Sequence, residues 1–412
     1  MRVLVLGGGA REHALVHALL ADPDVESVVC APGNAGIGRD VRTAPLDLTV
    51  PGDAAALALS LAVDLVVVGP EGPLVAGVAD AVRASGITCF GPSAEAARLE
   101  GSKAFAHEVM AAAAVPTSRS AVATTADEVA RALDEFGPPY VVKDDGLAAG
   151  KGVVVTDDRD EAHRHAIACG RVVIEEFLDG PEVSLFALSD GTTVVPLAPA
   201  QDFKRVGDGD SGPNTGGMGA YSPLPWAPAD LTDEVLKTVL APTIEEMARR
   251  GTPFAGLLYA GLALTSRGVR VIEFNARFGD PETQVVLARL RTPLGALLLA
   301  AATGELAQVG PLDWAPDAAV TVVVAAPGYP ESPQVGGVVE GLDVAATEPG
   351  VVVLHSGTAL DPEGHVVSTG GRVLSVVATG ADVAAARERA YRAVAQLRLY
   401  GSHHRTDIAA GI

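Results

Sequence analysis

The stretch VIEFNARFGDPE, residues 271–282, carries the strongest local signal in the chain. Apolar and polar side chains alternate through its first half, which predicts a β-strand with Val271, Glu273 and Asn275 on one face. Carboxylate and amide oxygens are hard ligands that suit Mg²⁺ when nucleotide phosphates complete its coordination. Glu273 and Asn275 are therefore candidate metal ligands. The alternative interpretation is an edge-strand salt bridge between Glu273 and Arg277.

A second stretch, VVKDDGLAAGKGVVV at residues 141–155, has the glycine content of a phosphate-binding loop. It is not the common P-loop, which needs four residues between its glycines and Ser or Thr after the lysine. Glycines give a backbone the freedom to lie against phosphates. The stretch supplies five candidate nucleotide-binding residues: Lys143, Gly146, Gly150, Lys151 and Gly152.

Between these two stretches, VVIEEFLDGPEVSLF at residues 172–186 predicts a strand, a turn and another strand. One interpretation is a hairpin with solvated acidic side chains. The other is a nucleotide-binding hinge, in which backbone groups near Glu176–Leu178 pair with a base edge and Glu182 takes the ribose hydroxyls.

Composition limits the possible classes of function. The chain has 412 residues, a formal net charge of −21 and 48% hydrophobic residues, which fits a folded protein of several domains and disfavours a nucleic-acid scaffold. Its three widely spaced cysteines predict neither a disulfide framework nor a zinc site. Because no apolar run reaches 18 residues and no signal peptide is evident, we expect no membrane partner and a cytoplasmic location.

The rhythm of elements predicts a fold that is α/β at its start and α+β later. Strand and helix patterns alternate through residues 1–100, which indicates a doubly wound parallel sheet. Its first turn, GGGAREHAL at 7–15, is either a tight strand-to-helix turn or an anion seat to which Arg11 adds charge. We expect a central domain at 101–116 and 190–312, a small unit at 117–189 and a β-rich domain at 313–412.

Three further stretches have residue types that can carry chemistry. The polar, Gly-rich segment 201–223 predicts a long irregular loop with a functional role. GDSGP at 209–213 resembles a serine-protease loop, but its setting is wrong for that fold. AHRHA at 162–166 is better explained as a solvated helix face than as a metal site.

Taken together, the motifs EGSKAF, VVKDDGLAAGKGV, VVIEEFLDGPEVS, QDFKR, GPNTGGMGAYSP and VIEFNARFGDPE resemble those of ATP-grasp ligases. With GGGAREHAL, APGNAG, VGPEGPLVAG, GGRVL and HRTDI, the chain resembles the phosphoribosylamine–glycine ligase family over roughly residues 2–409. The resemblance implies an N-terminal doubly wound domain, an ATP-grasp core with a small lid subdomain and a C-terminal β-rich domain.

The resemblance also implies ATP-dependent ligation of glycine to 5-phosphoribosylamine through glycyl phosphate, in a protein we expect to be a monomer. Another ATP-grasp carboxylate–amine ligase of purine metabolism, or a nucleotide sensor without catalysis, are the alternatives. The cofactors would be ATP and Mg²⁺ or Mn²⁺, the metal on Glu273 and Asn275. The nucleotide would contact Lys103, Lys143, the glycine loop with Lys151, the hinge residues Glu175, Glu176, Phe177 and Leu178, and Glu182.

For the substrates, the resemblance implies that phosphoribosylamine lies near Gly9, Arg11, Glu71, Asp280 and Arg372. Glycine would lie by the 201–219 loop, near Asp202 and Gly217, with Asp202, Lys204 and Arg277 as the catalytic residues. The sequence departs from the family pattern at Ala10, Asp144 and Phe203. It also has a shortened segment before VVIEEFL.

Overall fold

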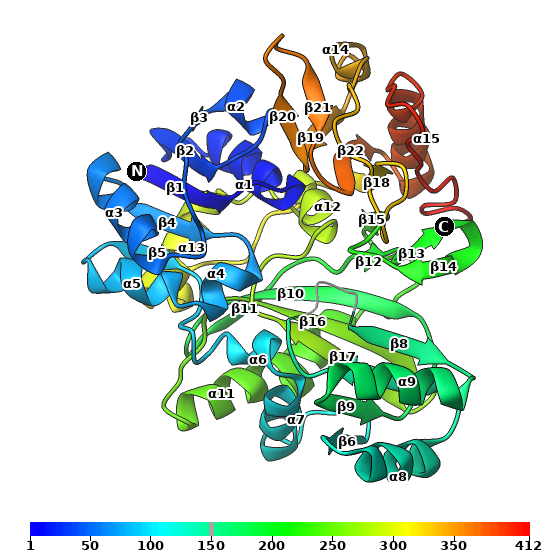
Figure 1. The fold of residues 1–412 in the computed structure, drawn as a ribbon. Helices are drawn as coiled ribbons and strands as arrows, with labels where there is room; N and C mark the ends of the chain where they lie inside the picture. The colour runs from blue at the N-terminus through cyan, green and yellow to red at the C-terminus, as the bar shows by residue number, and fades with distance from the viewer. Residues whose placement is uncertain (148–151) are drawn as a thin grey trace.

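The computed structural model describes residues 1–147 and 152–412 (Figure 1). Its first 100 residues form a parallel sheet in the order β3-β2-β1-β4-β5, which confirms the predicted doubly wound unit. Alternate residues of β1 join different cores, Leu4 and Leu6 on one face and Val3 and Val5 on the other, so both faces are covered. The elements are β1 (Arg2–Gly7), α1 (Ala10–Leu20), β2 (Ser27–Pro32), α2 (Ile37–Asp40), β3 (Arg42–Thr43), α3 (Pro51–Leu61), β4 (Leu65–Val68), α4 (Glu71–Val75), α5 (Val78–Ala84) and β5 (Thr88–Phe90).

The central unit is an antiparallel sheet in the order β11-β10-β16-β17, with helices beside it. Strand β10 belongs to this sheet, although it falls within residues 117–189 that we expected to form the small unit. The elements are α6 (Arg98–Gly101), α7 (Lys103–Ala112), β10 (Glu182–Asp190), β11 (Val194–Pro196), α10 (Leu231–Val235), the π-helix η2 (Leu236–Leu240), α11 (Ala241–Arg249), β16 (Ala255–Thr265), β17 (Gly268–Asn275), α12 (Glu282–Arg289), α13 (Leu294–Thr303) and the 3-10 helix η3 (Leu306–Gln308).

The small unit is a second antiparallel sheet in the order β6-β9-β7-β8, covered by two helices. It has a hydrophobic core of its own, built from residues such as Leu133, Val142 and Ile174. Its elements are β6 (Ser120–Ala123), α8 (Ala126–Phe136), β7 (Tyr140–Asp144), β8 (Val153–Thr156), α9 (Arg159–Cys169) and β9 (Val172–Glu175). A separate core allows this unit to act as a lid that moves as one body.

The C-terminal sheet has the order β12-β15-β18-β22-β19 and takes two of its strands from the segment 201–223. The prediction of an irregular loop there is wrong, because four short strands fold within it. Strand β15 forms by backbone pairing with β18, a distant strand that the Gly-rich composition of the segment does not reveal. The elements are β12 (Gln201–Asp202), β13 (Arg205–Gly207), the 3-10 helix η1 (Asp208–Asp210), β14 (Ser211–Asn214), β15 (Gly219–Ser222), β18 (Ala318–Ala325), α14 (Leu342–Ala345), β19 (Val351–His355), β20 (Thr358–Leu360), β21 (Val366–Ser368), β22 (Arg372–Gly380) and α15 (Val383–Val394).

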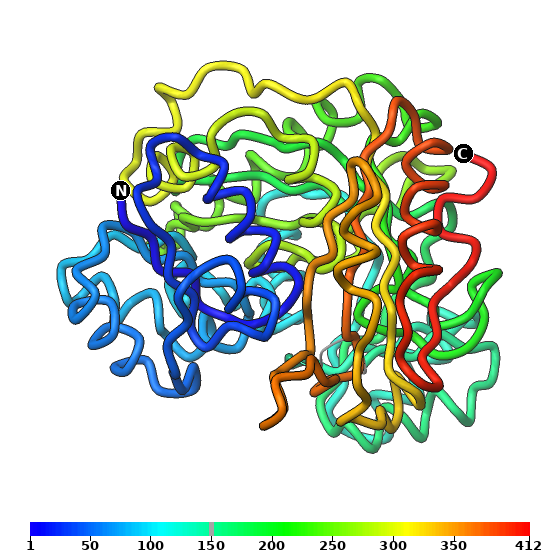
Figure 2. The backbone as a smooth tube through the Cα atoms, turned by 90° about the horizontal axis from the view of Figure 1, so that it is seen from above, coloured from blue at the N-terminus to red at the C-terminus, as the bar shows by residue number. Residues whose placement is uncertain are grey.

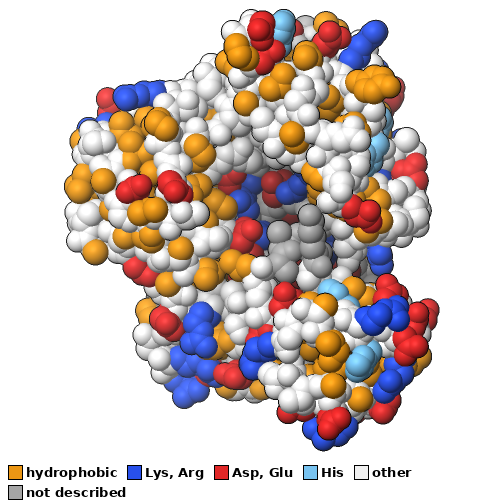
Figure 3. Space-filling model, viewed as in Figure 1, with side chains coloured by type: hydrophobic (Ala, Val, Ile, Leu, Met, Phe, Trp, Pro, Cys, Tyr) orange, Lys and Arg blue, Asp and Glu red, His pale blue; other side chains and the backbone are white. Residues whose placement is uncertain are grey.

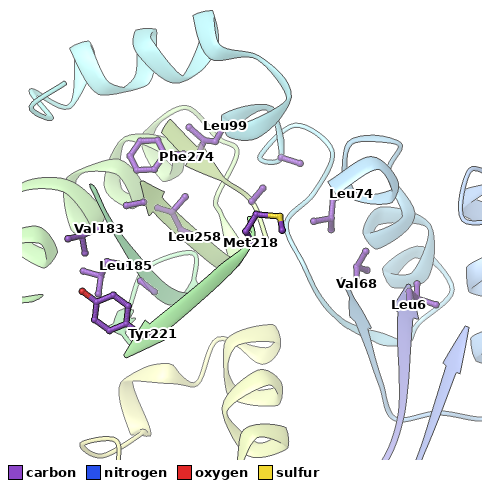
Figure 4. Packing of buried hydrophobic residues seen from close by; sticks show 14 of the residues in the cluster. Leu6, Val68, Leu74, Leu99, Val183, Leu185, Met218, Tyr221, Leu258 and Phe274 are labelled. Atoms are coloured by element: carbon purple, nitrogen blue, oxygen red, sulfur yellow. The ribbon is translucent and has the colours of Figure 1, made fainter. Parts of the chain in front are cut away.

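Buried side chains join three of these units. Leu6 and Val68 of the N-terminal sheet and Leu74 of α4 belong to the same buried cluster as Leu258 and Phe274 of the central sheet (Figure 4). Val320 of β18, in the C-terminal sheet, belongs to the same cluster. The N-terminal and C-terminal parts lie side by side, with the two chain ends on opposite sides of the molecule (Figure 2). In the part of the chain that the structure describes, no helix is both long and apolar enough to cross a membrane.

A pair of buried histidines lies where the N-terminal and C-terminal parts meet. The backbone N–H of His355 on β19 donates to Nδ1 of His13 on α1 at 2.8 Å, and His13 Nε2 pairs with Asp40 at 2.8 Å. His355 Nδ1 lies 3.0 Å from Thr358 Oγ1. Burial, reinforced by His13, lowers the pKa of His355 to about 4. His355 is therefore neutral in the folded protein at pH values where it is charged in the unfolded chain.

This difference predicts a loss of stability in mild acid. In the unfolded chain His355 binds a proton below about pH 6.5, and in the folded chain only below about pH 4. The free energy of unfolding therefore falls as the pH drops through that window. At pH 5 the loss of unfolding free energy relative to neutral pH is about 2 kcal/mol. His355→Gln should lose correspondingly less unfolding free energy between pH 7 and pH 5 in urea titrations. Equal losses in the variant and the wild type would contradict the assignment.

Candidate functional site

A cavity of about 820 Å³ lies where the four units meet. Charged side chains of both signs gather in the hollow at the centre of the molecule (Figure 3). Its lining includes most of the residues predicted from the sequence: Arg11, Glu71, Lys103, Lys143, Gly146, Gly152, Glu175, Glu176, Phe177, Leu178, Glu182, Asp202, Lys204, Glu273, Asn275, Arg277, Asp280 and Arg372. Gly150 and Lys151 lie outside the described residues.

Strand β17, which ends at the cavity, has a β-bulge just before Glu273. Gly261 of β16 pairs with Glu273 and the next residue, Leu262, pairs with Val271, so Ile272 is an extra residue in β17. The predicted strict alternation is therefore wrong. Val271 and Phe274 both belong to the hydrophobic core, while Glu273 and Asn275 line the cavity. The bulge also leaves the Ile272 carbonyl free to accept a hydrogen bond from Lys143 Nζ at 2.9 Å.

Lys143 also forms a buried ion pair with Glu175 at 2.9 Å, within the lid sheet. Glu175 accepts further hydrogen bonds from Ser118 Oγ at 2.7 Å and pairs with His107 Nε2 at 3.0 Å. Burial opposes ionisation of Glu175, but Lys143 and His107 outweigh it and lower its pKa to about 2. The Glu175 side chain is therefore engaged inside the protein. No local pattern identifies His107 as a site residue, because its partner Glu175 is 68 residues away.

The next hinge residue, Glu176, points away from Lys143 and pairs with Arg119 and Arg267, each at 3.1 Å. Phe177 is 47% exposed and lines the cavity together with Leu178. The carboxylates of Glu175 and Glu176 are thus both held in ion pairs. The chain between Glu176 and Leu178 faces the cavity.

Opposite the hinge lies an acidic cluster with one lysine. Lys204 forms ion pairs with Glu182 and, at 4.0 Å, with Asp202. Burial raises the pKa of Asp202 to about 7; Lys204 opposes the rise, and the carboxylates of Glu282, Glu182 and Glu273 add to it. Burial lowers the pKa of Lys204, but Asp202 and Glu182, with smaller contributions from Tyr259 and Glu273, outweigh it and hold that pKa well above its ordinary value. A cluster with more carboxylates than cations attracts a further positive group.

The Gly-rich loop is tied to helix α7 at its near end. Asp145 accepts hydrogen bonds from Ser102 Oγ at 3.0 Å and from the Ala104 N–H at 2.9 Å, and it pairs with Arg171 at 2.7 Å. Lys103, in the first turn of α7, donates to the Gly146 carbonyl at 3.1 Å. The two adjacent aspartates therefore differ, since Asp144 ends strand β7 and Asp145 binds the N-terminus of α7.

On the N-terminal side, Arg277 lies between two carboxylates, one at the start of α4 and one on α6. It pairs with Glu100 at 2.9 Å and with Glu71 at 3.2 Å. These are its ion pairs within the described residues, so the predicted alternative of a Glu273–Arg277 bridge is not observed there. Glu100 also accepts the Ala276 N–H at 2.7 Å, and burial raises its pKa. Sequence reasoning missed Glu100 as a site residue, although it begins the motif EGSKAF.

Arg11 lies beside this network at the start of α1. Its guanidinium pairs with Glu12 at 2.6 Å, lies 3.9 Å from Glu71 and donates to the Phe278 carbonyl at 3.2 Å. Glu71 follows β4 and Arg11 follows β1, the two neighbouring strands at which the chain order of the sheet reverses. Ligands of such sheets bind at this edge.

The C-terminal domain contributes Arg372, which pairs with Asp280 at 3.2 Å and donates to the Asp280 carbonyl at 2.7 Å. Gly9 and Gly217 flank the same aspartate rather than line the cavity. A Cβ atom at Gly9 would lie 3.7 Å from Asp280 Oδ2, and one at Gly217 would lie 3.4 Å from its carbonyl. Asp280 is thus the point where three units of the chain converge.

The donors at the end of β17 fit a hard divalent cation. Glu273 and Asn275 present two oxygens to a cavity that already holds an excess of carboxylates. Among the described residues, no three His, Cys, Asp or Glu side chains form a metal cluster. Mg²⁺ is commonly held by one or two carboxylates with substrate phosphates and water, so two protein ligands suffice for it.

Comparison with known proteins gives a consistent result. Models of the phosphoribosylglycinamide synthetase N domain, ATP-grasp (A) domain and C domain match residues 1–100, 101–283 and 319–411. The chain is 67% identical to a phosphoribosylamine–glycine ligase of Streptomyces coelicolor, with 100% of this chain and 99% of that one covered.

Solved structures agree with this match. A phosphoribosylamine–glycine ligase from Thermotoga maritima has a TM-score of 0.85 and 34% identity, covering 99% of this chain and 100% of that one. The biotin carboxylase domain of a Hydrogenobacter thermophilus 2-oxoglutarate carboxylase, solved with MgADP and bicarbonate, has a TM-score of 0.75 at 17% identity, covering 98% and 91%; this likeness concerns the fold alone. With three domains matched in order, the chain belongs to the phosphoribosylglycinamide synthetase family.

Proposed function

We propose that the chain is an ATP-dependent ligase that joins glycine to 5-phosphoribosylamine, forming glycinamide ribonucleotide, ADP and phosphate. The observation that carries the proposal is one cavity with two chemically different halves. The lid lysines and the Glu273–Asn275 strand end suit a metal-bound nucleotide, and the sheet edge with Arg11 and Arg372 suits a sugar phosphate. The names of the relatives over the whole length of the chain support it.

The nucleotide would lie between the lid and the central sheet. Lys103 and Lys143 are close to the Gly-rich loop and would contact the phosphates, with Gly146, Gly150, Lys151 and Gly152 over them. The hinge residues Glu176–Leu178 would hold adenine, with Glu175 fixing Lys143 from behind. Glu182, paired with Lys204, would accept hydrogen bonds from the ribose hydroxyl groups.

Glu273 and Asn275 would hold Mg²⁺ or Mn²⁺, which when bound neutralises phosphate charge. Phosphoryl transfer depends mainly on positioning and charge stabilisation. Arg277 would face the phosphoryl group as it moves to the glycine carboxylate, which gives glycyl phosphate and ADP. Its two carboxylate partners, Glu71 and the buried Glu100, keep the guanidinium fixed in orientation. Asp202, beside Lys204, would hold the glycine ammonium.

In the second step the amine of phosphoribosylamine attacks the acyl carbon of glycyl phosphate, and phosphate leaves. Arg11 and Arg372 would orient the sugar phosphate, with Glu71 and Asp280 keeping both guanidinium groups in place. Closure of the lid would keep water away from the acyl phosphate. No nucleophilic side chain is needed for either step.

The reaction itself is the first test. Purified protein with MgATP should release ADP only when glycine is present, because glycine supplies the attacking carboxylate. Added phosphoribosylamine should convert this into one amide per ADP, measured by a coupled ADP assay and mass spectrometry. Steady ADP release that does not need glycine would instead indicate another ATP-grasp substrate.

Glu273→Gln tests the proposed metal ligand. The change keeps the shape but removes the charge, so we expect kcat to fall by about 100-fold or more. Titration calorimetry provides a readout besides activity, since Mg²⁺ should no longer strengthen ADP binding to the variant. Glu245→Gln, at an exposed position of α11, is the matched control and should leave both measurements unchanged. Near-normal activity of Glu273→Gln would refute the metal role.

Asp202→Asn tests the glycine site. Loss of a charged hydrogen-bond partner for the ammonium should raise the KM for glycine by about 10-fold or more. Because the pKa of Asp202 is about 7, its carboxylate forms as the pH rises through 7. In the wild type kcat/KM for glycine should therefore rise across that range, and in the variant it should not. An unchanged pH profile in the variant would exclude Asp202 from this role.

A further inference from the structure

The hairpin formed by β13 and β14, residues 205–214, stands apart from the larger sheets. Its strands pair only with each other in the described structure, and the outer strand Ser211–Asn214 is largely exposed. Nevertheless, Arg205, Asp210 and Asn214 line the cavity. A segment with so little packing of its own needs another part of the chain to fix its position.

The base of the hairpin is joined to the proposed glycine site. Thr215, just after the hairpin, donates to the Lys204 carbonyl through both its backbone N–H and its hydroxyl, each at 2.8 Å. Lys204 in turn pairs with Glu182 and lies 4.0 Å from Asp202. Displacement of the hairpin would therefore move Lys204 and open the wall of the cavity beside it.

Three residues near the C-terminus, Arg405, Thr406 and Asp407, hold the hairpin tip; we name them the C-terminal clasp. Arg405 Nη1 pairs with Asp210 at 2.7 Å and donates to the Arg205 carbonyl at 3.2 Å. The Thr406 N–H donates to Asp208 at 2.7 Å, and Asp407 accepts the Gly209 N–H at 2.8 Å. Figure 1 shows the C-terminus beside β13 and β14.

Two features show that this contact is specific. Arg405 is only 2% exposed, its guanidinium also pairs with Asp407 at 2.7 Å, and it lies over the Phe203 ring at 4.9 Å. Asp210 has a φ of +53°, a left-handed conformation that is unfavourable for a residue other than glycine. Such a conformation persists where the surroundings enforce it, and Arg405 is the ion-pair partner of Asp210.

The clasp is itself fixed to the last helix. Tyr391 of α15 donates its hydroxyl to the Arg405 carbonyl at 2.7 Å and accepts the Ile408 N–H at 3.1 Å. Arg387 donates to the carbonyls of Thr406 at 2.6 Å and Ile408 at 2.9 Å. The hairpin is thus attached to the C-terminal domain rather than to the central sheet.

We propose that Arg405 is a positioning residue that, through Asp210 and the Arg205 carbonyl, holds the hairpin 205–214 as a wall that excludes water from glycyl phosphate. This inference rests on the proposed function. In the productive step the amine attacks the acyl carbon and phosphate leaves. If the wall is displaced, water attacks the same carbon, phosphate leaves and glycine is regenerated, so ATP is consumed without amide formation.

The test is the ratio of ADP released to glycinamide ribonucleotide formed, with glycine, phosphoribosylamine and MgATP at saturation. Arg405→Gln removes both contacts to the hairpin. Asp208→Ala removes the contacts of Thr406 to the tip at an exposed position outside the cavity lining, where misfolding is not expected. Arg392→Gln is the matched control. Arg392 lies on α15, the helix to which the clasp is fixed, and the change breaks its 2.7 Å ion pair with Glu348 without touching the hairpin.

We expect a ratio of ADP to amide near one for the wild type and for Arg392→Gln. For Arg405→Gln and Asp208→Ala, here called the two clasp variants, we expect a ratio of roughly two or more, because the wall no longer excludes water. A purely structural role would lower the amount of active enzyme and leave this ratio unchanged. A ratio of one in both clasp variants would overturn the inference and leave the proposed function intact. A wild type that released no ADP in response to glycine would overturn both.

Discussion

The architecture of the site depends on the buried ion network around Arg277. A guanidinium removed from water is stable only where carboxylates compensate its charge, and Glu71 and Glu100 do so from different elements. Glu71 begins α4 after β4, and Arg277 follows β17. Their pairing therefore brings the reversal point of the parallel sheet against the end of the central strand. The cavity is the space that remains at this junction.

A second constraint fixes the lid relative to the same strand. Lys143 on β7 forms an ion pair with Glu175 within the lid sheet, and a second of its three N–H donors binds the Ile272 carbonyl of β17. An unbulged edge strand would not present that carbonyl in the same way while keeping Val271 in the core. The extra residue Ile272 thus has three effects: it keeps Val271 in the core, it binds Lys143 of the lid through its carbonyl, and it directs Glu273 to the cavity.

These two constraints explain how far the sequence could predict the structure. Local periodicity was sufficient for the parallel sheet, and residue type pointed to Glu273 and Asn275, which line the cavity. The bulge at Ile272 leaves composition unchanged. Within 201–223, β15 pairs with the distant strand β18, and β12 pairs with β15. His107 and Glu100 were missed because their partners come from distant segments, which no local pattern records.

The adjacent Asp144 and Asp145 show how one local feature serves this larger arrangement. An acceptor at the N-terminus of a helix satisfies free N–H groups and suits the positive end of its dipole. Asp145 fills that place on α7 from the neighbouring lid, and Arg171 balances its charge from just before β9. Lys103, in the same first turn, reaches the Gly146 carbonyl. Asp145 therefore joins the start of the Gly-rich loop to α7, the helix that carries the first lysine of the nucleotide half.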